Sequence, residues 1–263
     1  MESRYELALR IGREASALAH RYFIDRDTLA VEAKGSQDYV SIADRAVEDL
    51  IRAGVAEHFP GDAFLGEESA KAYAGGDEGV WIVDPVDGTH NFLRGARYYC
   101  VSIAYVERGR REIGVVCDPE HDEIFHARRG DGAWVSRGGE RSRLSVSQCA
   151  ELSRAFVCLG HHDRFASPQY LEVRRAFMEH GVAMRNMGAG ALQLAHVAAG
   201  RYDGFVELSL NAWDAMAGLL LVEEAGGFTA PFPGPQGITK PAPVLACAKG
   251  IAEPLMALVG AWR

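Results

Sequence analysis

One short stretch of the sequence constrains the fold more than any other, because it joins a buried strand to a carboxylate-bearing turn. The apolar run 81–83 (Trp-Ile-Val) is typical of a fully buried strand, and Asp84 follows it directly. Pro85 fixes φ and lacks a backbone N–H, so we expect it to force the chain out of the strand. The sequence therefore predicts a strand over residues 79–83 and then a tight turn that carries both Asp84 and Asp87.

Two carboxylates on one tight turn repel each other unless a positive charge lies between them. A hard divalent cation can supply that charge, and Mg²⁺ prefers oxygen ligands and usually keeps some of its waters. Gly88 permits a positive φ, and the amides of Gly88 and Thr89 can open a helical turn with free N–H groups, which bind anions. The turn thus favours a metal site beside a phosphate site, although Asp, Pro and Gly are also common in turns for local reasons.

Two further acidic segments share this pattern of an apolar stretch followed by carboxylates beside Gly or Trp. Glu67 and Glu68 follow Gly66, and Asp214 follows Trp213. Taken alone, the glutamate pair is typical of a solvated surface and Asp214 of a helix N-cap. Taken together, the three segments favour one shared metal site.

Hydrophobic periodicity predicts helices and strands that alternate along the chain. Helices are expected over residues 6–22, 41–59, 168–180, 190–199, 212–225 and 251–262. Strands are expected over residues 63–65, 79–83, 100–107, 112–117, 123–127, 132–135, 155–159, 204–208 and 244–248. The polar residues 34–38 and the proline-rich residues 231–243 are expected to be loops. Because the central strands follow one another as in an antiparallel meander, we expect a layered α/β or α+β fold. It would form one domain over residues 1–263, with a soft division near residues 145–151.

Charge and cysteine content narrow the class of protein. The 36 acidic residues outnumber the 28 basic ones and give a net charge of −8, which argues against a general nucleic-acid binder. No apolar run approaches the roughly 18–20 residues that span a bilayer, and the N-terminus lacks a signal peptide's apolar core. The five cysteines are scattered and odd in number, as expected for reduced thiols. We therefore expect a cytoplasmic protein that does not enter membranes.

The acidic segments resemble the signature motifs of the inositol monophosphatase family of magnesium-dependent, lithium-sensitive phosphatases. Residues 64–69 (FLGEES) are similar to its acidic loop, residues 81–92 (WIVDPVDGTHNF) to its first signature, and residues 213–227 to its second. The motifs are long, occur in the family's order and extend over most of the chain. The resemblance implies a five-layered αβαβα sugar-phosphatase fold, usually assembled as a homodimer.

The same resemblance implies two to three Mg²⁺ ions per active site. Glu67, Asp84 and the carbonyl of Val86 would hold the first ion. Asp84, Asp87 and Asp214 would hold the second, with Asp84 bridging the two ions. A third, weaker ion would lie near Glu67, through waters.

The resemblance also assigns catalytic and substrate-binding residues. Thr89, supported by Asp44, would orient and help to deprotonate a water on the first ion, with Glu67 as the third catalytic residue. Ala189 stands where a hydroxyl residue is common, so one substrate contact would be absent. The residues expected to contact the substrate are Asp87, Gly88, Thr89, Gly188, Ala189, Gly190, Glu207 and Asp214.

The function that follows is hydrolysis of inositol 1-phosphate or a related polyol or sugar phosphate. Relatives of the family also act on fructose 1,6-bisphosphate, 3′-phosphonucleotides or histidinol phosphate, so these substrates stay open. A second class is a regulatory protein, because some bacterial members act in complexes with RNA polymerase or ribosomal RNA. If the pure protein hydrolysed no phosphate ester in the presence of magnesium, the regulatory class would be favoured.

Overall fold

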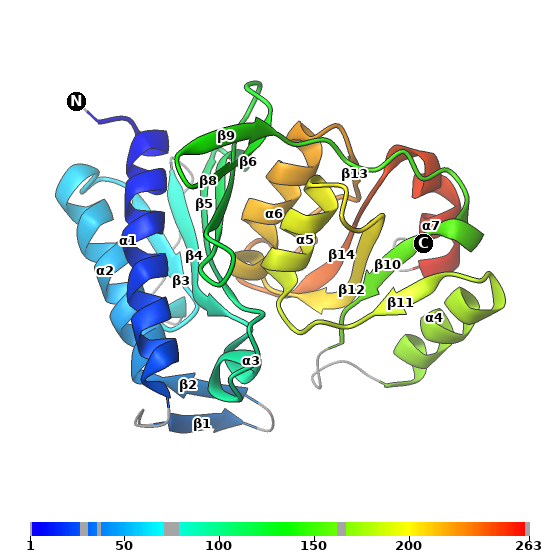
Figure 1. Ribbon diagram of the computed structural model, residues 1–263, viewed down its shortest axis with the longest axis horizontal. Coiled ribbons are helices and arrows are strands. Elements are labelled where there is room, and N and C mark those ends of the chain that lie inside the picture. Colours follow the sequence, from blue (N-terminus) through cyan, green and yellow to red (C-terminus); the bar gives the residue numbers. More distant parts are fainter. Residues whose placement is uncertain (1, 27–30, 36–37, 71–78, 162–166, 261–263) are drawn as a thin grey trace.

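The elements of the chain stack in five layers, helix on sheet on helix on sheet on helix, as Figure 1 shows. The computed structural model describes residues 2–26, 31–35, 38–70, 79–161 and 167–260, with backbone only for 31–35, 38–41 and 167. Within these residues, no helix combines the length and the apolarity that crossing a bilayer requires. The layered fold expected from the sequence pattern, and the αβαβα architecture implied by the family resemblance, are confirmed.

The helices are α1 (Arg4–Ile24), α2 (Ile42–His58), α3 (Thr89–Leu93), α4 (Ser167–Glu179), α5 (Gly190–Ala198), α6 (Ala212–Glu224) and α7 (Ala252–Val259), with 3-10 turns at Leu152–Arg154 and Lys249–Ile251. The strands are β1 (Val31–Gly35), β2 (Asp38–Ser41), β3 (Ala63–Gly66), β4 (Val80–Asp87), β5 (Cys100–Glu107), β6 (Arg110–Asp118), β7 (Glu123–Arg128), β8 (Ala133–Arg137), β9 (Glu140–Arg143), β10 (Phe156–Leu159), β11 (Ala183–Arg185), β12 (Gly204–Leu210), β13 (Phe228–Thr229) and β14 (Ala242–Cys247).

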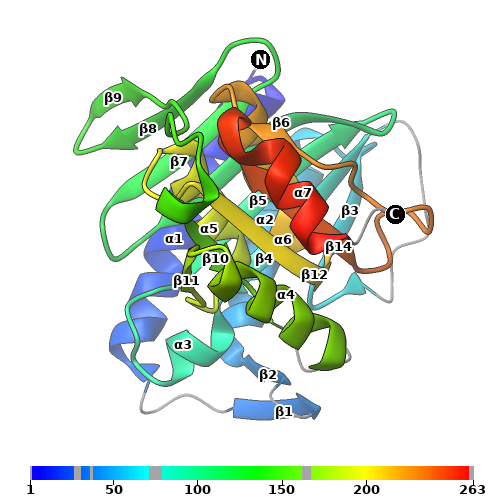
Figure 2. The same cartoon turned by 90° about the vertical axis from the view of Figure 1, so that its right-hand side faces the viewer.

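The two larger sheets differ in their connections. The first runs in the order β3-β4-β5-β6-β7-β8-β9, with β3 parallel to β4 and every later pair antiparallel. This sheet is the meander predicted from the sequence. The second runs β11-β10-β12-β14-β13, and its β10 pairs in parallel with both β11 and β12. Figure 2 looks onto α4 and α7, which cover the outer face of this second sheet.

The outer helices of the first sheet form because each has one apolar stripe. Ser3 and Glu6 make a capping box that fixes the start of α1. Leu7, Ile11 and Ala15 then recur at helical spacing and are fully buried. These side chains belong to one apolar core with α2 and the face of the sheet that α1 and α2 cover.

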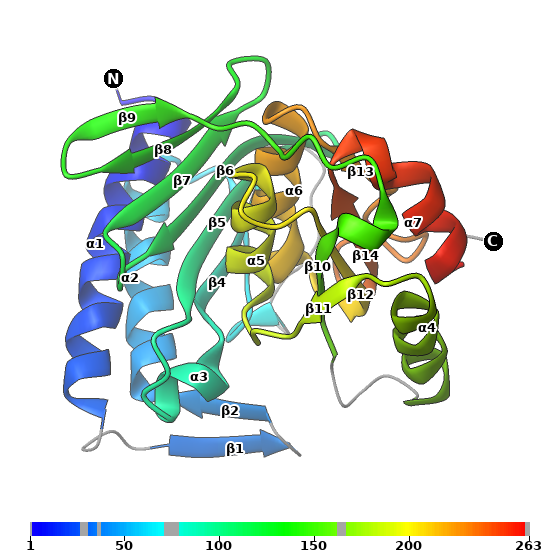
Figure 3. The same ribbon diagram turned by 45° about the vertical axis from the view of Figure 1, so that its right-hand side comes forward.

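The central helices α5 and α6 are apolar on nearly all sides, because they lie between the two sheets (Figure 3). Glycine permits their close packing. A Cβ at Gly218 would lie 2.4 Å from the Cβ of Leu194, and one at Gly114 would lie 2.6 Å from the carbonyl oxygen of Ala217. The resulting core contains residues from both sheets and both helices. The single domain over residues 1–263 stays a prediction.

Two local predictions were wrong. Pro85 does not end the strand: β4 continues to Asp87, because a bulge places the proline where the ladder needs no N–H donor. Of the residues expected to form a loop, 34 and 35 belong to β1 and 38 begins β2, and these two strands pair in antiparallel orientation. Residues 36–37 lie outside the described residues. The mixture of Val, Ala and charged residues in the two strands carries no strong strand signal.

Candidate active site

The bulge in β4 brings two carboxylates to one face of the sheet. Asp84 pairs with Ser102 and Asp87 pairs with Cys100, so β4 contains one residue more than β5 between these two pairs. Side chains alternate along a strand, and residues three apart would otherwise face opposite sides. The Oδ1 of Asp84 accepts the N–H of Val86 at 2.9 Å within the bulge. The extra residue therefore turns Asp87 toward the face that carries Asp84.

The first turn of α5 holds the carboxylate of Asp87. Gly190 N–H donates to Oδ1 at 3.1 Å, and Ala191 N–H donates to Oδ2 at 2.8 Å. These amides have no partners within the helix, and the helix dipole favours a negative charge at this end. The interaction fixes α5 against the end of β4, with Asp87 only 6% exposed.

The third carboxylate, Asp214, lies in the first turn of α6. Asn211 is the N-cap of α6, and Asp214 is its partner in the capping box. Asp214 therefore does not cap the helix itself, which is the role that an Asp at this position has when it is taken alone. Ser102 donates its hydroxyl to the carbonyl of Trp213 at 3.0 Å, which ties the start of α6 to β5. One oxygen each of Asp84, Asp87 and Asp214 lies within 4.8 Å of the others.

Glu67 approaches this trio from the end of β3. Its N–H donates to the carbonyl of Val83 at 3.0 Å, and its charge raises the pKa of Asp84. Glu48, which is 3% exposed, accepts the N–H of Glu68 at 2.9 Å and a hydrogen bond from Arg52 at 2.7 Å. The buried carboxylate of Glu48, paired with the partly exposed Arg52, positions the acidic loop, and the sequence analysis missed it.

Thr89 lies at the start of α3, next to Gly88 with its φ of 90°. Its hydroxyl is 3.0 Å from the carbonyl of Val86 and 3.3 Å from the Oδ1 of Asp44, which is fully buried. The structure thus brings Thr89, Asp44 and Val86 together at the end of β4.

The remaining predicted substrate residues fall into two places. A Cβ at Gly88 would lie 3.2 Å from the carbonyl oxygen of Gly188 and 3.1 Å from the Cβ of Ala189, so this segment borders the α3 turn. Glu207 is buried on β12, against the backbone of Gly160. β12 leads directly into α6, which places Glu207 on the strand that precedes Asp214.

Burial and mutual repulsion raise the pKa of the clustered carboxyls. For Asp84, burial raises the pKa well above its ordinary value, and the charges of Glu67 and Asp214 raise it further. For Asp87, burial and the charge of Asp214 raise the pKa to about 7, while the amides of α5 oppose the shift. Without a cation the cluster resists full ionisation at neutral pH. Three clustered carboxylates, two of them buried, fit a hard divalent metal ion.

The chain is similar in sequence and in fold to proteins of one family. The sequence model of the inositol monophosphatase family matches residues 1–259. The chain is 39% identical to an inositol-1-monophosphatase of Mesorhizobium japonicum over 97% of this chain and 93% of that protein. It is also 39% identical to the Nus factor SuhB of Pseudomonas aeruginosa, over 89% and 87%. The crystal structure of the extragenic suppressor protein suhB from Bartonella henselae superposes with a TM-score of 0.85 at 34% identity, over 96% of each chain.

We expect the stabilisation by Mg²⁺ to grow as the pH rises. An unfolded Asp ionises near pH 4, whereas Asp87 in the metal-free fold ionises near 7. The metal-free fold therefore holds a proton that the unfolded chain releases, and this contribution to stability is lost as pH rises through that window. Mg²⁺ binds the ionised form, so its effect is small while the carboxyls are protonated.

The measurement is the melting temperature from about pH 5 to about pH 8, with Mg²⁺ and with a chelator. Burial lowers the pKa of His126 and His196 to about 4, so these two histidines make the fold more stable as the pH rises. Their effect is the same with Mg²⁺ and with the chelator. The difference between the two curves therefore isolates the carboxylates, and Asp131→Asn on the exposed β7–β8 turn is the control. A difference that stays constant or shrinks with pH would contradict the assignment.

Proposed function

Because the chain belongs to the inositol monophosphatase family and is a phosphoric monoester hydrolase, we propose that it hydrolyses inositol 1-phosphate or a related polyol phosphate with Mg²⁺. One observation carries the metal requirement: three carboxylates, two buried on β4 and one half-buried on α6, lie within 4.8 Å of one another. Burial and the charges of neighbouring carboxylates raise the pKa of Asp84 and Asp87, which supports a requirement for added positive charge.

The proposed ligand set uses each acidic segment. Glu67, Asp84 and the carbonyl of Val86 would hold one ion, and Asp84, Asp87 and Asp214 a second, with a third, weaker ion near Glu67. The bound ions would polarise the phosphate and lower the pKa of the attacking water, which is about 15.7 in bulk. The protein fixes the carboxylates in advance, through the β4 bulge, the α5 amides and the α6 capping box.

Thr89 and Asp44 form the proposed proton path. The Thr89 hydroxyl donates toward Asp44 at 3.3 Å, so it can accept a proton from water while it passes its own to the carboxylate. Glu67 would orient the same water from the opposite segment. Burial of Asp44 keeps bulk water from competing for the proton.

Substrate contacts are proposed around the α3 turn and the start of α5. The amides of Gly88 and Thr89 would bind phosphate oxygens, since free N–H groups at this turn favour an anion. Asp87, Asp214 and the segment Gly188–Ala189–Gly190 would border the leaving alcohol. Glu207 would accept hydrogen bonds from ring hydroxyls.

A second role is favoured by one observation, namely that several relatives carry the name Nus factor SuhB at 34–39% identity. We propose that this chain could act in an RNA complex as well, through surfaces outside the acidic cluster. The homodimer and the cytoplasmic location stay predictions.

The function is tested by phosphate release from a panel of inositol 1-phosphate, fructose 1,6-bisphosphate, a 3′-phosphonucleotide and histidinol phosphate. Mg²⁺ is varied in each assay, and a chelator and lithium are added separately. We expect the highest kcat/KM for inositol 1-phosphate, loss of turnover with chelator, and inhibition by lithium. Full activity in chelator would overturn the metal role, and inertness toward the whole panel would favour the regulatory role alone.

Glu207→Gln should weaken binding of polyol substrates while it spares the chemistry. The amide keeps some hydrogen bonds but loses charge assistance, so about 1 kcal/mol and a roughly five-fold rise in KM for inositol 1-phosphate are expected. An aryl phosphate without ring hydroxyls should be hydrolysed as before. Steady-state kinetics on both substrates check this, with the exposed Glu172→Gln on α4 as the control. Equal losses on both substrates would remove Glu207 from the polyol side of the pocket.

A further inference from the structure

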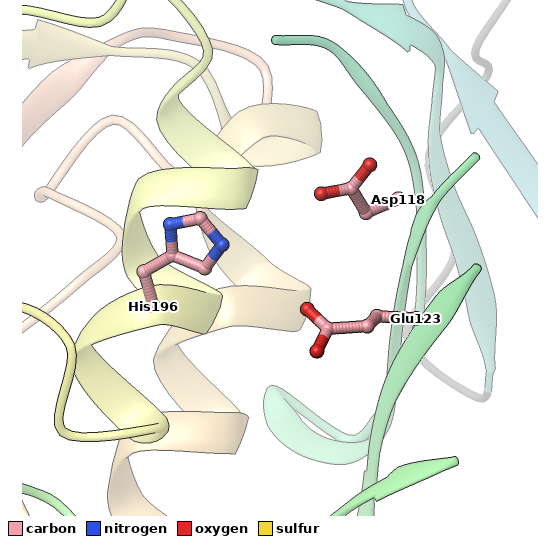
Figure 4. A group of neighbouring side chains, drawn as sticks. All are labelled: Asp118, Glu123 and His196. Carbon is pink, nitrogen blue, oxygen red and sulfur yellow. The ribbon is translucent and has the colours of Figure 1, made fainter. Parts of the chain in front are cut away.

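A second group of potential metal ligands lies between the first sheet and α5, apart from the acidic cluster. Asp118 ends β6 and Glu123 begins β7, so the two residues pair across the base of one turn. His196 projects from α5, and Figure 4 shows its ring facing both carboxylates. One ligand atom from each of the three residues lies within 4.8 Å of the others, and Asp118, Glu123 and His196 are 2%, 6% and 7% exposed as whole residues.

The imidazole of His196 has an unsatisfied nitrogen that faces this group. Nδ1 lies 3.3 Å from the hydroxyl of Tyr98, whereas Nε2 is buried and has no hydrogen-bond partner among the described residues. In Figure 4 the ring nitrogen farther from the backbone faces Asp118 and Glu123. Leaving a buried polar atom unpaired costs about 1–3 kcal/mol, so the position calls for a ligand.

The ring itself does not provide the missing positive charge. Burial lowers the pKa of His196 to about 4, and the nearby charge of Arg201 lowers it further, so the imidazole is neutral at physiological pH. In the tautomer that donates its Nδ1 proton to Tyr98, the ring presents a lone pair on Nε2. A lone pair aimed at two carboxylates is unfavourable unless a cation lies between them.

Outer partners hold both carboxylates in place. Glu123 accepts two hydrogen bonds from Arg201, each at 2.6 Å. Asp118 accepts the N–H of Glu120 at 3.0 Å and contacts the ring of His121 at 2.8 Å. Each carboxylate oxygen has more than one acceptor site, so these bonds orient the groups without using all their lone pairs. Arg201 and His121 are themselves partly exposed, with side chains 41% and 56% accessible, so water weakens their charges.

A cavity of about 450 Å³ opens onto Asp118 and Glu123, bordered also by Arg13, His20 and Ser136. This cavity gives an ion a route from solvent to the carboxylates.

We propose that Asp118, Glu123 and His196 form a separate site for a divalent transition-metal ion, with Zn²⁺ as the representative. One imidazole nitrogen and two carboxylate oxygens suit Zn²⁺ or a related ion, whereas Mg²⁺ prefers oxygen alone. The all-oxygen cluster of Asp84, Asp87 and Asp214 has the opposite preference. The two sites therefore differ in the ions that they select.

An ion at this site would cross-link the β6–β7 turn to α5. Amides in the first turn of α5 donate hydrogen bonds to Asp87. One of them belongs to Gly190, six residues before His196. Bound Zn²⁺ would therefore stabilise the contact between the first sheet and the helix that holds Asp87. The expected readout is stability and bound metal, independent of phosphate release.

The test is equilibrium dialysis of the whole protein against Zn²⁺ in excess Mg²⁺, followed by counting the zinc retained per chain. The wild-type protein should retain about one more Zn²⁺ per chain than His196→Leu, and its melting temperature should rise with zinc. His180→Leu, at an exposed histidine after α4, is the matched control and should behave as wild type. The extra zinc should persist in Asp84→Asn, because that change touches only the acidic cluster.

Asp118→Asn provides a second variant if His196→Leu does not fold, since it preserves shape and the backbone hydrogen bonds. It too should lose the extra zinc and the thermal shift. Equal zinc retention by the wild type and both variants would overturn the proposal. So would loss of the extra zinc in Asp84→Asn, which would assign the ion to the acidic cluster and leave a water beside His196.

Discussion

Repulsion among clustered carboxylates is the constraint on which the rest of this structure depends. Asp84, Asp87 and Asp214 lie within 4.8 Å of one another, and burial raises the pKa of the first two. Such groups are ordinarily far apart or exposed to water, because burying unpaired charges costs free energy. Three elements instead converge to hold them: a bulge in β4, the amide end of α5 and the capping box of α6. The cluster lowers the stability of the metal-free fold, and a bound cation would offset the repulsion among the carboxylates.

The layered fold explains how this convergence is possible. α5 and α6 lie between two sheets and are buried on nearly all sides, so their first turns are fixed with little freedom. Gly114 and Gly218 let α6 approach β6 and α5 closely, which sets the position of Asp214 relative to Asp87. The proposed zinc site lies at the other end of α5, where His196 meets the β6–β7 turn. One helix would then contact an all-oxygen cluster at its start and a mixed nitrogen and oxygen cluster near its end.

The sequence predicted the layers, the meander and the grouping of the acidic segments, because these follow from periodicity and from long motifs. It could not predict the bulge, since Pro85 reads as a strand end unless the pairing with β5 is known. Glu48 gave no signal because a charged residue on an amphipathic helix is ordinarily solvated, and only the loop packed on it shows its role. Asp118, Glu123 and His196 are up to 78 positions apart, and only the tertiary fold brings them together. The assigned roles of Glu67, Thr89, Asp44 and Glu207 stay proposals.

The central claim is that the clustered carboxylates are held together in order to share divalent metal ions. Calorimetric titration of Mg²⁺ into the metal-free protein tests it most directly, with Asp84→Asn compared against the wild type and Asp131→Asn as the surface control. Binding should be strong in the wild type and the control. In Asp84→Asn it should be lost or greatly weakened, although the circular dichroism spectrum stays native. Unchanged Mg²⁺ affinity in Asp84→Asn would contradict the claim.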